Sequence, residues 1–104
     1  MPTTVIGGRE IQVNDEGFLT DPTQWSADLA TELAALIGQP LTEAHWTLIH
    51  FLREDHAVTG ETATLRRIST QTGVPIKELF TLFPGKPAKK LSYVAGLPKP
   101  KGCV

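Results

Sequence analysis

The chain is poor in cysteine: of its 104 residues only Cys103, next to the C-terminal residue, carries a thiol. A single cysteine cannot close a disulfide within the chain. Long uncharged apolar runs are also missing, which argues against a membrane span or a secretory signal. These absences predict one small domain in a cytoplasmic, reducing compartment, with no membrane among its partners.

Acidic side chains are absent from the C-terminal end. Residues 1–85 carry five basic and eleven acidic side chains, whereas residues 86–104 carry five lysines and no acidic side chain. A basic segment on an acidic body could dock on that body, meet an acidic partner protein or approach RNA phosphates. The charge pattern alone is equally compatible with a solvated, lysine-rich end.

Motifs for common catalytic and metal sites are also missing. The sequence has no Gly-rich phosphate loop and no nucleophile–base pair whose spacing defines a hydrolytic triad. Its three histidines, His45, His50 and His56, are separated by five and six residues, whereas two ligands on one helical face need a spacing of three or four. We therefore expect no metal, no cofactor and no catalysis beyond what one thiol can do.

The N-terminal segment has the pattern of a β-hairpin. Two short β-branched runs, Thr3 to Ile6 and Glu10 to Val13, flank Gly7-Gly8-Arg9. Paired glycines between two such runs are typical of a hairpin turn. The sequence therefore predicts a small hairpin before the first helix.

Cap residues, prolines and glycines then divide the remaining chain into five helices. The predicted segments run from Asp21 to Gly38, from Thr42 to Gly60, from Thr62 or Thr64 to Gly73, from Pro75 to Pro84 and from Pro87 to Gly96. The expected fold is mainly α (small α+β): a five-helix orthogonal bundle with an N-terminal β-hairpin.

Each predicted helix carries apolar residues at helical spacing, which indicates a face that packs into a core. The candidate core residues are Trp25, Leu29, Leu33, Leu36 and Ile37; Trp46, Leu48, Ile49, Phe51 and Leu52; Leu65 and Ile68; Ile76, Leu79, Phe80 and Phe83; and Leu91, Val94 and Ala95.

The third and fourth predicted helices, joined around Gly73, have the length and punctuation of a helix-turn-helix. Reading base edges needs polar side chains on the second helix, and that helix offers only Lys77, Glu78 and Thr81 among apolar residues. A pair of helices that simply pack together is therefore favoured over a DNA-binding surface.

The last eight residues differ from the domain before them. We interpret residues 1–96 as a single helical domain with its hairpin, and residues 97–104 as a flexible C-terminal arm that carries Cys103. Pro98 and Pro100 favour polyproline II, which could place the sulfur roughly 20 Å from its anchor, and Gly102 permits a bend next to Cys103. The cysteine is thus placed to meet another molecule.

These C-terminal residues resemble the arm of the DsrC/TusE family. The similarity rests on Pro87-Ala88-Lys89, on Ala95 to Pro100 and on Gly102-Cys103-Val104. Further matches are Asp15 to Leu19, Leu82-Phe83-Pro84 and the Glu43, His45, Trp46, Phe51-Leu52-Arg53 run, so the resemblance covers nearly the whole chain.

The resemblance implies a sulfur carrier whose penultimate cysteine, here Cys103, accepts a persulfide and passes the sulfur on. In the TusE branch the implied donor is a TusBCD- or DsrEFH-like complex, and the implied acceptor is the enzyme that makes 2-thiouridine in tRNA. In the DsrC branch, which acts in sulfur oxidation or sulfite reduction, a second arm cysteine joins the first. Its position here holds Ser92. A hydroxyl cannot form a disulfide, so the single-thiol relay is favoured.

Basic side chains near the thiol fit this chemistry, because the thiolate is the attacking species. Lys99, Lys101 and Lys89 would favour the anion, as would Lys90, whereas the carboxylate of the C-terminal residue opposes it. By resemblance, Arg66 and less directly Arg53 match basic positions that help to receive the arm or its sulfur; surface ion pairs are the alternative. A regulatory, DNA-binding relative remains the alternative function.

Overall fold

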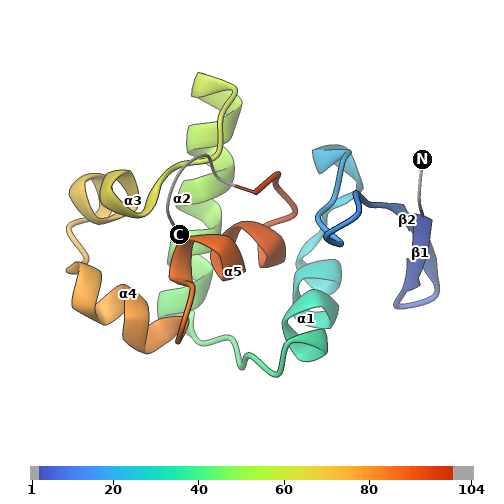
Figure 1. Ribbon diagram of the computed structural model, residues 1–104, viewed down its shortest axis with the longest axis horizontal. Coiled ribbons are helices and arrows are strands. Elements are labelled where there is room, and N and C mark those ends of the chain that lie inside the picture. The colour runs from blue at the N-terminus through green and yellow to red at the C-terminus, as the bar shows by residue number, and fades with distance from the viewer. Residues whose placement is uncertain (1–2, 100–104) are drawn as a thin grey trace.

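The computed structural model describes residues 3–99 and confirms a mainly α fold with an N-terminal hairpin (Figure 1). Its elements are β1 (Thr3–Ile6), β2 (Arg9–Gln12), a 3-10 turn (Pro22–Gln24), α1 (Ala27–Leu36), α2 (Glu43–Thr59), α3 (Leu65–Thr72), α4 (Ile76–Leu82) and α5 (Pro87–Val94). Among these residues, no helix is long and apolar enough to span a membrane.

The hairpin turn is one residue shorter than predicted. Arg9 pairs with Ile6 in the antiparallel ladder, so the loop contains only Gly7 and Gly8, at φ +59° and +79°. A two-residue turn with positive φ at both positions matches the twist of the paired strands, and glycine adopts it without strain. Val13, predicted to end the second strand, instead forms a separate bridge with Leu19.

The first helix begins later than predicted, because the chain contains two successive caps. Asp21 accepts a hydrogen bond from the amide of Thr23 and caps only the 3-10 turn. Trp25 then has extended backbone, and the Ser26 hydroxyl accepts a bond of 3.1 Å from the amide of Leu29 to start α1. The prediction of one helix from Asp21 was wrong.

The buried face of α1 also differs from the predicted stripe. Leu29 and Leu33 are buried as expected, but Leu36 is 64% exposed and Ile37 38% exposed. Ala30 and Ala34 complete the buried face instead. The small side chains of Ala30 and Ala34 allow α1 to approach α5 closely. The sequence prediction considered only large apolar residues and therefore did not include these two alanines.

The α3–α4 pair begins and ends as the sequence predicts. Thr64 caps α3 through a bond from the amide of Arg67, and Gly73 ends it at φ +78°. In α4, Leu79 and the following Phe83 are buried, but Ile76 and Phe80 are 43% and 42% exposed, so these two are not core residues.

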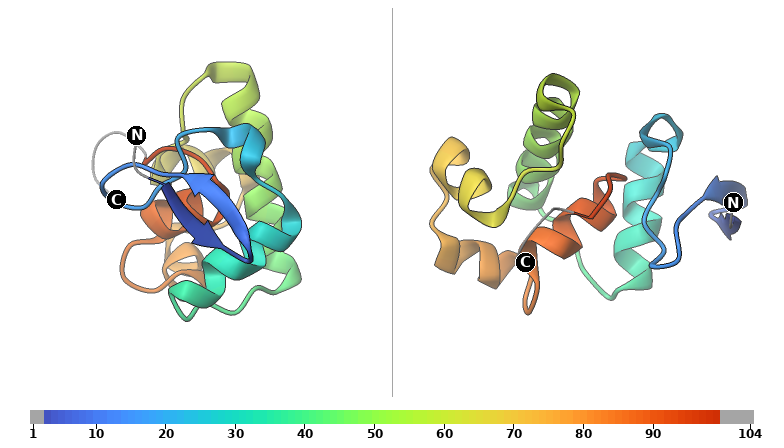
Figure 2. Two further views of the ribbon diagram at one scale, coloured as in Figure 1. Left: turned by 90° about the vertical axis from the view of Figure 1, so that its right-hand side faces the viewer. Right: turned by 45° about the horizontal axis from the view of Figure 1, so that its top comes forward.

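Helix α5 lies at the centre of the molecule. It packs against α1 on one side and against α2 and α4 on the other, with the hairpin beyond α1 (Figures 1 and 2). One core cluster fills the space among all five helices, with Ala30 and Ala34 as the contribution of α1, and a second lies between the hairpin and α1. Trp25 and Tyr93 pack against both clusters and therefore join them.

His45 is a buried structural residue. Its Nδ1 accepts a bond of 3.0 Å from the Thr42 amide at the start of α2, which leaves Nε2 to donate to the Leu82 carbonyl at 2.8 Å. Its ring also lies edge-on to Phe83, with centroids 4.9 Å apart. The histidine thus ties the start of α2 to the end of α4.

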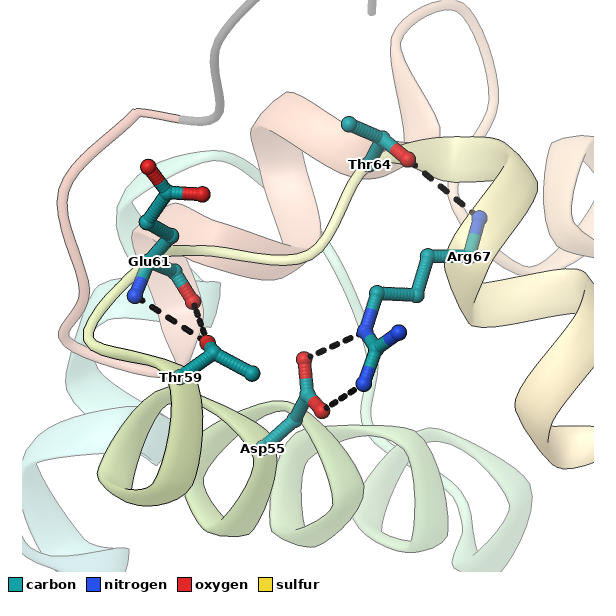
Figure 3. A network of polar contacts seen from close by, with 5 residues as sticks. All are labelled: Asp55, Thr59, Glu61, Thr64 and Arg67. Atoms are coloured by element: carbon teal, nitrogen blue, oxygen red, sulfur yellow. Dashed lines mark hydrogen bonds and ion pairs between the residues drawn. The ribbon is translucent and has the colours of Figure 1, made fainter.

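Asp55 and Arg67 join α2 to α3 through two parallel bonds (Figure 3). Arg67 Nε and Nη2 donate to the two carboxylate oxygens at 2.9 and 2.7 Å. The hydrogen bond from Arg67 lowers the pKa of Asp55 below its ordinary value. A lowered folded-state pKa means that the pair stabilises the fold when Asp55 is ionised.

We predict that Asp55→Asn destabilises the protein more at pH 7 than at pH 3. The contribution of the carboxylate is complete above its unfolded-state pKa, about 3.9, and is lost as the pH falls through the lower folded-state pKa. Urea unfolding at both pH values measures the difference. Glu54→Gln is the control, because Glu54 has no hydrogen bond or ion pair within residues 3–99. An equal loss at both pH values for Asp55→Asn would contradict the prediction.

Candidate functional site

Two side chains hold the C-terminal end of α5. Trp25 Nε1 donates to the Val94 carbonyl at 2.9 Å, and Arg53 Nη1 donates to the Ala95 carbonyl at 2.7 Å. The Arg53 guanidinium lies 4.2 Å from the centre of the Trp25 ring and also donates to the Pro22 carbonyl at 3.1 Å. We call this group the Arg53–Trp25 clamp. It satisfies helix-end carbonyls that otherwise have no partner.

The chain leaves α5 through a Schellman motif at Gly96. The Gly96 amide donates to the Tyr93 carbonyl at 3.2 Å and the Leu97 amide to the Ser92 carbonyl at 3.1 Å. Gly96 has φ +71°, and a Cβ at this position would lie 2.5 Å from Trp25 Cδ1. Only glycine fits, because both the backbone angle and the adjacent indole exclude a side chain.

Residues 97–99 of the predicted arm contact the domain. Leu97 is 1% exposed and belongs to the main core. The Thr62 hydroxyl donates to the Pro98 carbonyl at 2.8 Å, and Lys99 Nζ lies 3.4 Å from Glu16 Oε2. The path of the chain is therefore defined as far as Lys99. Lys101, Gly102 and Cys103 lie outside the described residues.

The structure brings two of the predicted lysines together. Lys89 Nζ on α5 lies 3.7 Å from the same Glu16 oxygen that Lys99 approaches. Lys90 instead donates to the Pro84 carbonyl at 2.6 Å. Two ammonium groups around one carboxylate leave a positive balance beside Lys99, the last described residue.

The other predicted residues lie apart from this group. Ser92 is fully buried on α5, and its hydroxyl donates to the Ala88 carbonyl at 2.7 Å. The Arg66 side chain is exposed on α3 and makes no hydrogen bond or ion pair within residues 3–99. Arg53 is engaged in the clamp, so its bonds go to backbone carbonyls. Burial of the guanidinium lowers the pKa of Arg53, because the charged form loses contact with water.

Glu16 and Thr62 were not predicted as residues of this site, and Trp25 was predicted only as a core residue. Each acts on a partner far along the chain, and the Glu16–Lys99 contact spans 83 residues. Glu16 belongs to the run that resembles the family, which was the only available signal. In the part of the chain that the structure describes, no three His, Cys, Asp or Glu side chains gather as metal ligands.

We predict that Gly96→Ala destabilises the protein more than Gly73→Ala does. Both glycines have positive φ, +71° and +78°, but a Cβ at Gly73 meets no atom within 4 Å. Gly73→Ala should therefore cost only the left-handed backbone strain, about 1–2 kcal/mol. Gly96→Ala should add overpacking against Trp25, about 1–3 kcal/mol more. Denaturant unfolding compares the two variants, and equal losses would show that the indole does not confine position 96.

Comparisons with known proteins agree along the whole chain. The family model described as DsrC like protein matches residues 5–104. The sulfurtransferase TusE of Salmonella typhimurium is 35% identical over 107 aligned positions, covering 96% of this chain and 98% of that protein. TusE of Escherichia coli K12 is 32% identical with the same coverage.

Solved structures give the same result. The NMR structure of Allochromatium vinosum DsrC superposes with a TM-score of 0.86 at 35% identity, covering 98% of this chain and 97% of that one. The oxidised gamma subunit of the dissimilatory sulfite reductase of Archaeoglobus fulgidus gives a TM-score of 0.81 at 32% identity, covering 99% and 100%. With sequence, fold and length all in agreement, this chain belongs to the DsrC-like protein family.

Proposed function

We propose that this protein is a sulfur carrier that accepts a persulfide on Cys103 and passes the sulfur to an acceptor enzyme, in a relay that serves 2-thiouridine synthesis in tRNA. The observation that carries the proposal is the anchoring of the chain through Lys99, four residues before its only cysteine. Four residues reach at most ~14 Å, so the thiol is tethered close to a defined point on the domain. The sulfurtransferase name of the TusE relatives supports the same role.

The proposed transfer needs one nucleophile and no net oxidation. The Cys103 thiolate attacks the outer sulfur of the donor's persulfide; a new S–S bond forms on Cys103, the donor's S–S bond breaks, and the donor leaves as a thiolate. A thiolate of the acceptor then attacks the outer sulfur on Cys103 and restores the free thiol. The positive balance near Lys89 and Lys99 supports the anionic forms of both species.

The partners in this proposal are a TusBCD- or DsrEFH-like donor and a tRNA thiouridylase-like acceptor, both cytoplasmic. Arg66 fits a role in receiving the arm or its anionic sulfur, because its guanidinium is exposed and has no partner within residues 3–99. Lys101 and Gly102 are proposed to act on the arm itself, as a local positive charge and as a point of bending.

The alternative is a carrier of the two-thiol type that acts in sulfur oxidation or sulfite reduction. Ser92 opposes it, because the position where the resemblance places the second cysteine holds a hydroxyl bonded to the Ala88 carbonyl. Oxygen at this position cannot take part in a disulfide or trisulfide. The one-thiol relay is thus the better match to the chain.

We predict that Cys103→Ser folds normally and carries no sulfur. The residue is the second to last in the chain, so its replacement should change the free energy of unfolding by no more than ~0.5 kcal/mol. Incubation with a persulfidated donor protein should add the mass of one sulfur atom to the wild type, removable by a thiol reductant, and nothing to the variant. Intact-protein mass spectrometry measures the adduct. Sulfur gained by Cys103→Ser, or unfolding of that variant, would refute the carrier proposal.

We further predict that Ser92→Cys forms an internal disulfide with Cys103 under mild oxidation. The reaction requires the fully buried side chain at position 92 to become accessible, and the end of the arm to fold back on α5 and bring the two Cα atoms within about 4.4–6.8 Å. Non-reducing mass analysis after proteolysis identifies the bond. Lys77→Cys, an exposed position on α4, is the control and should give mainly intermolecular dimers. If Ser92→Cys also gives only dimers, the arm does not reach position 92.

A further inference from the structure

A pocket of about 410 Å³ lies beside the anchored segment, between α5 and the turn that precedes the 3-10 element. Its apolar part comes from Phe18, Ile37 and Tyr93, and its rim carries Glu16, Lys86, Lys89 and Lys90. The size is sufficient for one large side chain of another molecule. The pocket therefore combines an apolar floor with a mostly cationic edge.

The floor is uncharged and partly open to solvent. Phe18 and Tyr93 meet edge to face, with centroids 5.7 Å apart and planes at 82°. Burial raises the pKa of the Tyr93 phenol, so the ring stays neutral at physiological pH. Ile37 is 38% exposed although it is large and aliphatic. Covering this surface would remove apolar area from water, which favours binding of an apolar group.

The rim has one lysine that the domain leaves unpaired. Lys89 shares Glu16 with Lys99, and Lys90 donates to the Pro84 carbonyl. The Lys86 side chain is exposed and makes no hydrogen bond or ion pair within residues 3–99. Three lysines face one glutamate around the opening, so the electrostatic complement is a negatively charged segment.

We propose that this pocket docks the partner that exchanges sulfur with Cys103, by binding an acidic segment that inserts one large apolar side chain. The inference rests on the carrier function proposed above and adds a docking surface to it. Lys99 lies at the Glu16 edge of the pocket, and Cys103 follows four residues later, at most ~14 Å away. A protein that engages the thiol must therefore come close to this face.

The enclosed aromatic ring in the floor favours an acidic protein segment over RNA as the occupant of the pocket. Base stacking needs an open aromatic face, whereas Phe18 is only 2% exposed and lies in the floor. A carboxylate-bearing segment can contact Lys86 at the rim while its apolar side chain covers Ile37. Lys90 keeps its charge while it donates a hydrogen bond to the Pro84 carbonyl, and Lys89 shares the single charge of Glu16 with Lys99, so the rim keeps a net positive charge.

The test uses two synthetic peptides, acetyl-Asp-Glu-Phe-Glu-Asp-amide and its uncharged match acetyl-Asn-Gln-Phe-Gln-Asn-amide, titrated into ¹⁵N-labelled full-length protein. The acidic peptide should shift amide signals around Phe18, Ile37 and Lys86 and should saturate, and the uncharged peptide should bind roughly three- to tenfold more weakly. Lys86→Glu and Ile37→Ser should each weaken the acidic peptide by a similar factor. Lys77→Glu and Leu36→Ser, exposed residues outside the pocket, are the matched controls.

The docking proposal is overturned if the shifted amide signals lie outside the pocket or if both peptides bind equally. It is also overturned if the control variants weaken binding as much as the pocket variants do, or if sedimentation shows that the peptide binds only a dimer of this chain. Cys103→Ser should bind the acidic peptide like the wild type, because the described residues form the pocket. Peptide binding therefore tests the pocket, whereas sulfur uptake by Cys103 tests the carrier function, and either can fail alone.

Discussion

The Arg53–Trp25 clamp on the end of α5 is the interaction on which the rest of the structure depends. Trp25 packs against both core clusters, and its indole N–H and the Arg53 guanidinium satisfy the last carbonyls of the central helix. The same indole leaves no space for a side chain at Gly96, which fixes the direction in which the chain leaves the helix. The stacked pair of Arg53 and Trp25 thus holds the end of α5, contacts both core clusters and constrains the backbone at Gly96.

Features decided by neighbouring residues could be predicted from the sequence. Thr42 and Thr64 mark helix starts, and Gly60 and Gly73 mark helix ends, because capping depends on a few adjacent groups. The start of α1 was mispredicted because Asp21 and Ser26 are both good caps. Asp21 caps only the short 3-10 turn, and α1 begins after Ser26. The buried faces of α1 and α4 depend on which elements arrive from elsewhere, and helical spacing does not contain that information.

The candidate site divides in the same way. The reactive thiol of Cys103 and the lysines near it in the chain could be identified from the sequence. The family resemblance identified Ser92 as the position that holds a second cysteine in the two-thiol branch. The residues that anchor the chain at Lys99 could not be predicted, because Glu16 and Thr62 lie 83 and 36 residues from their partners. By resemblance Arg53 was expected to help receive the arm or its sulfur, whereas in the structure it donates to the carbonyls of Pro22 and Ala95.

The two contacts that hold Pro98 and Lys99 differ in kind, and this difference makes the length of the tether depend on ionic strength. The bond from the Thr62 hydroxyl to the Pro98 carbonyl joins neutral groups and is insensitive to salt. The contact between Lys99 and Glu16 joins exposed charges, which mobile ions screen over a Debye length of about 8 Å at 0.15 M. At low salt the described chain is anchored as far as residue 99, and at high salt as far as residue 98. The last anchor then lies five residues before Cys103 in the sequence instead of four.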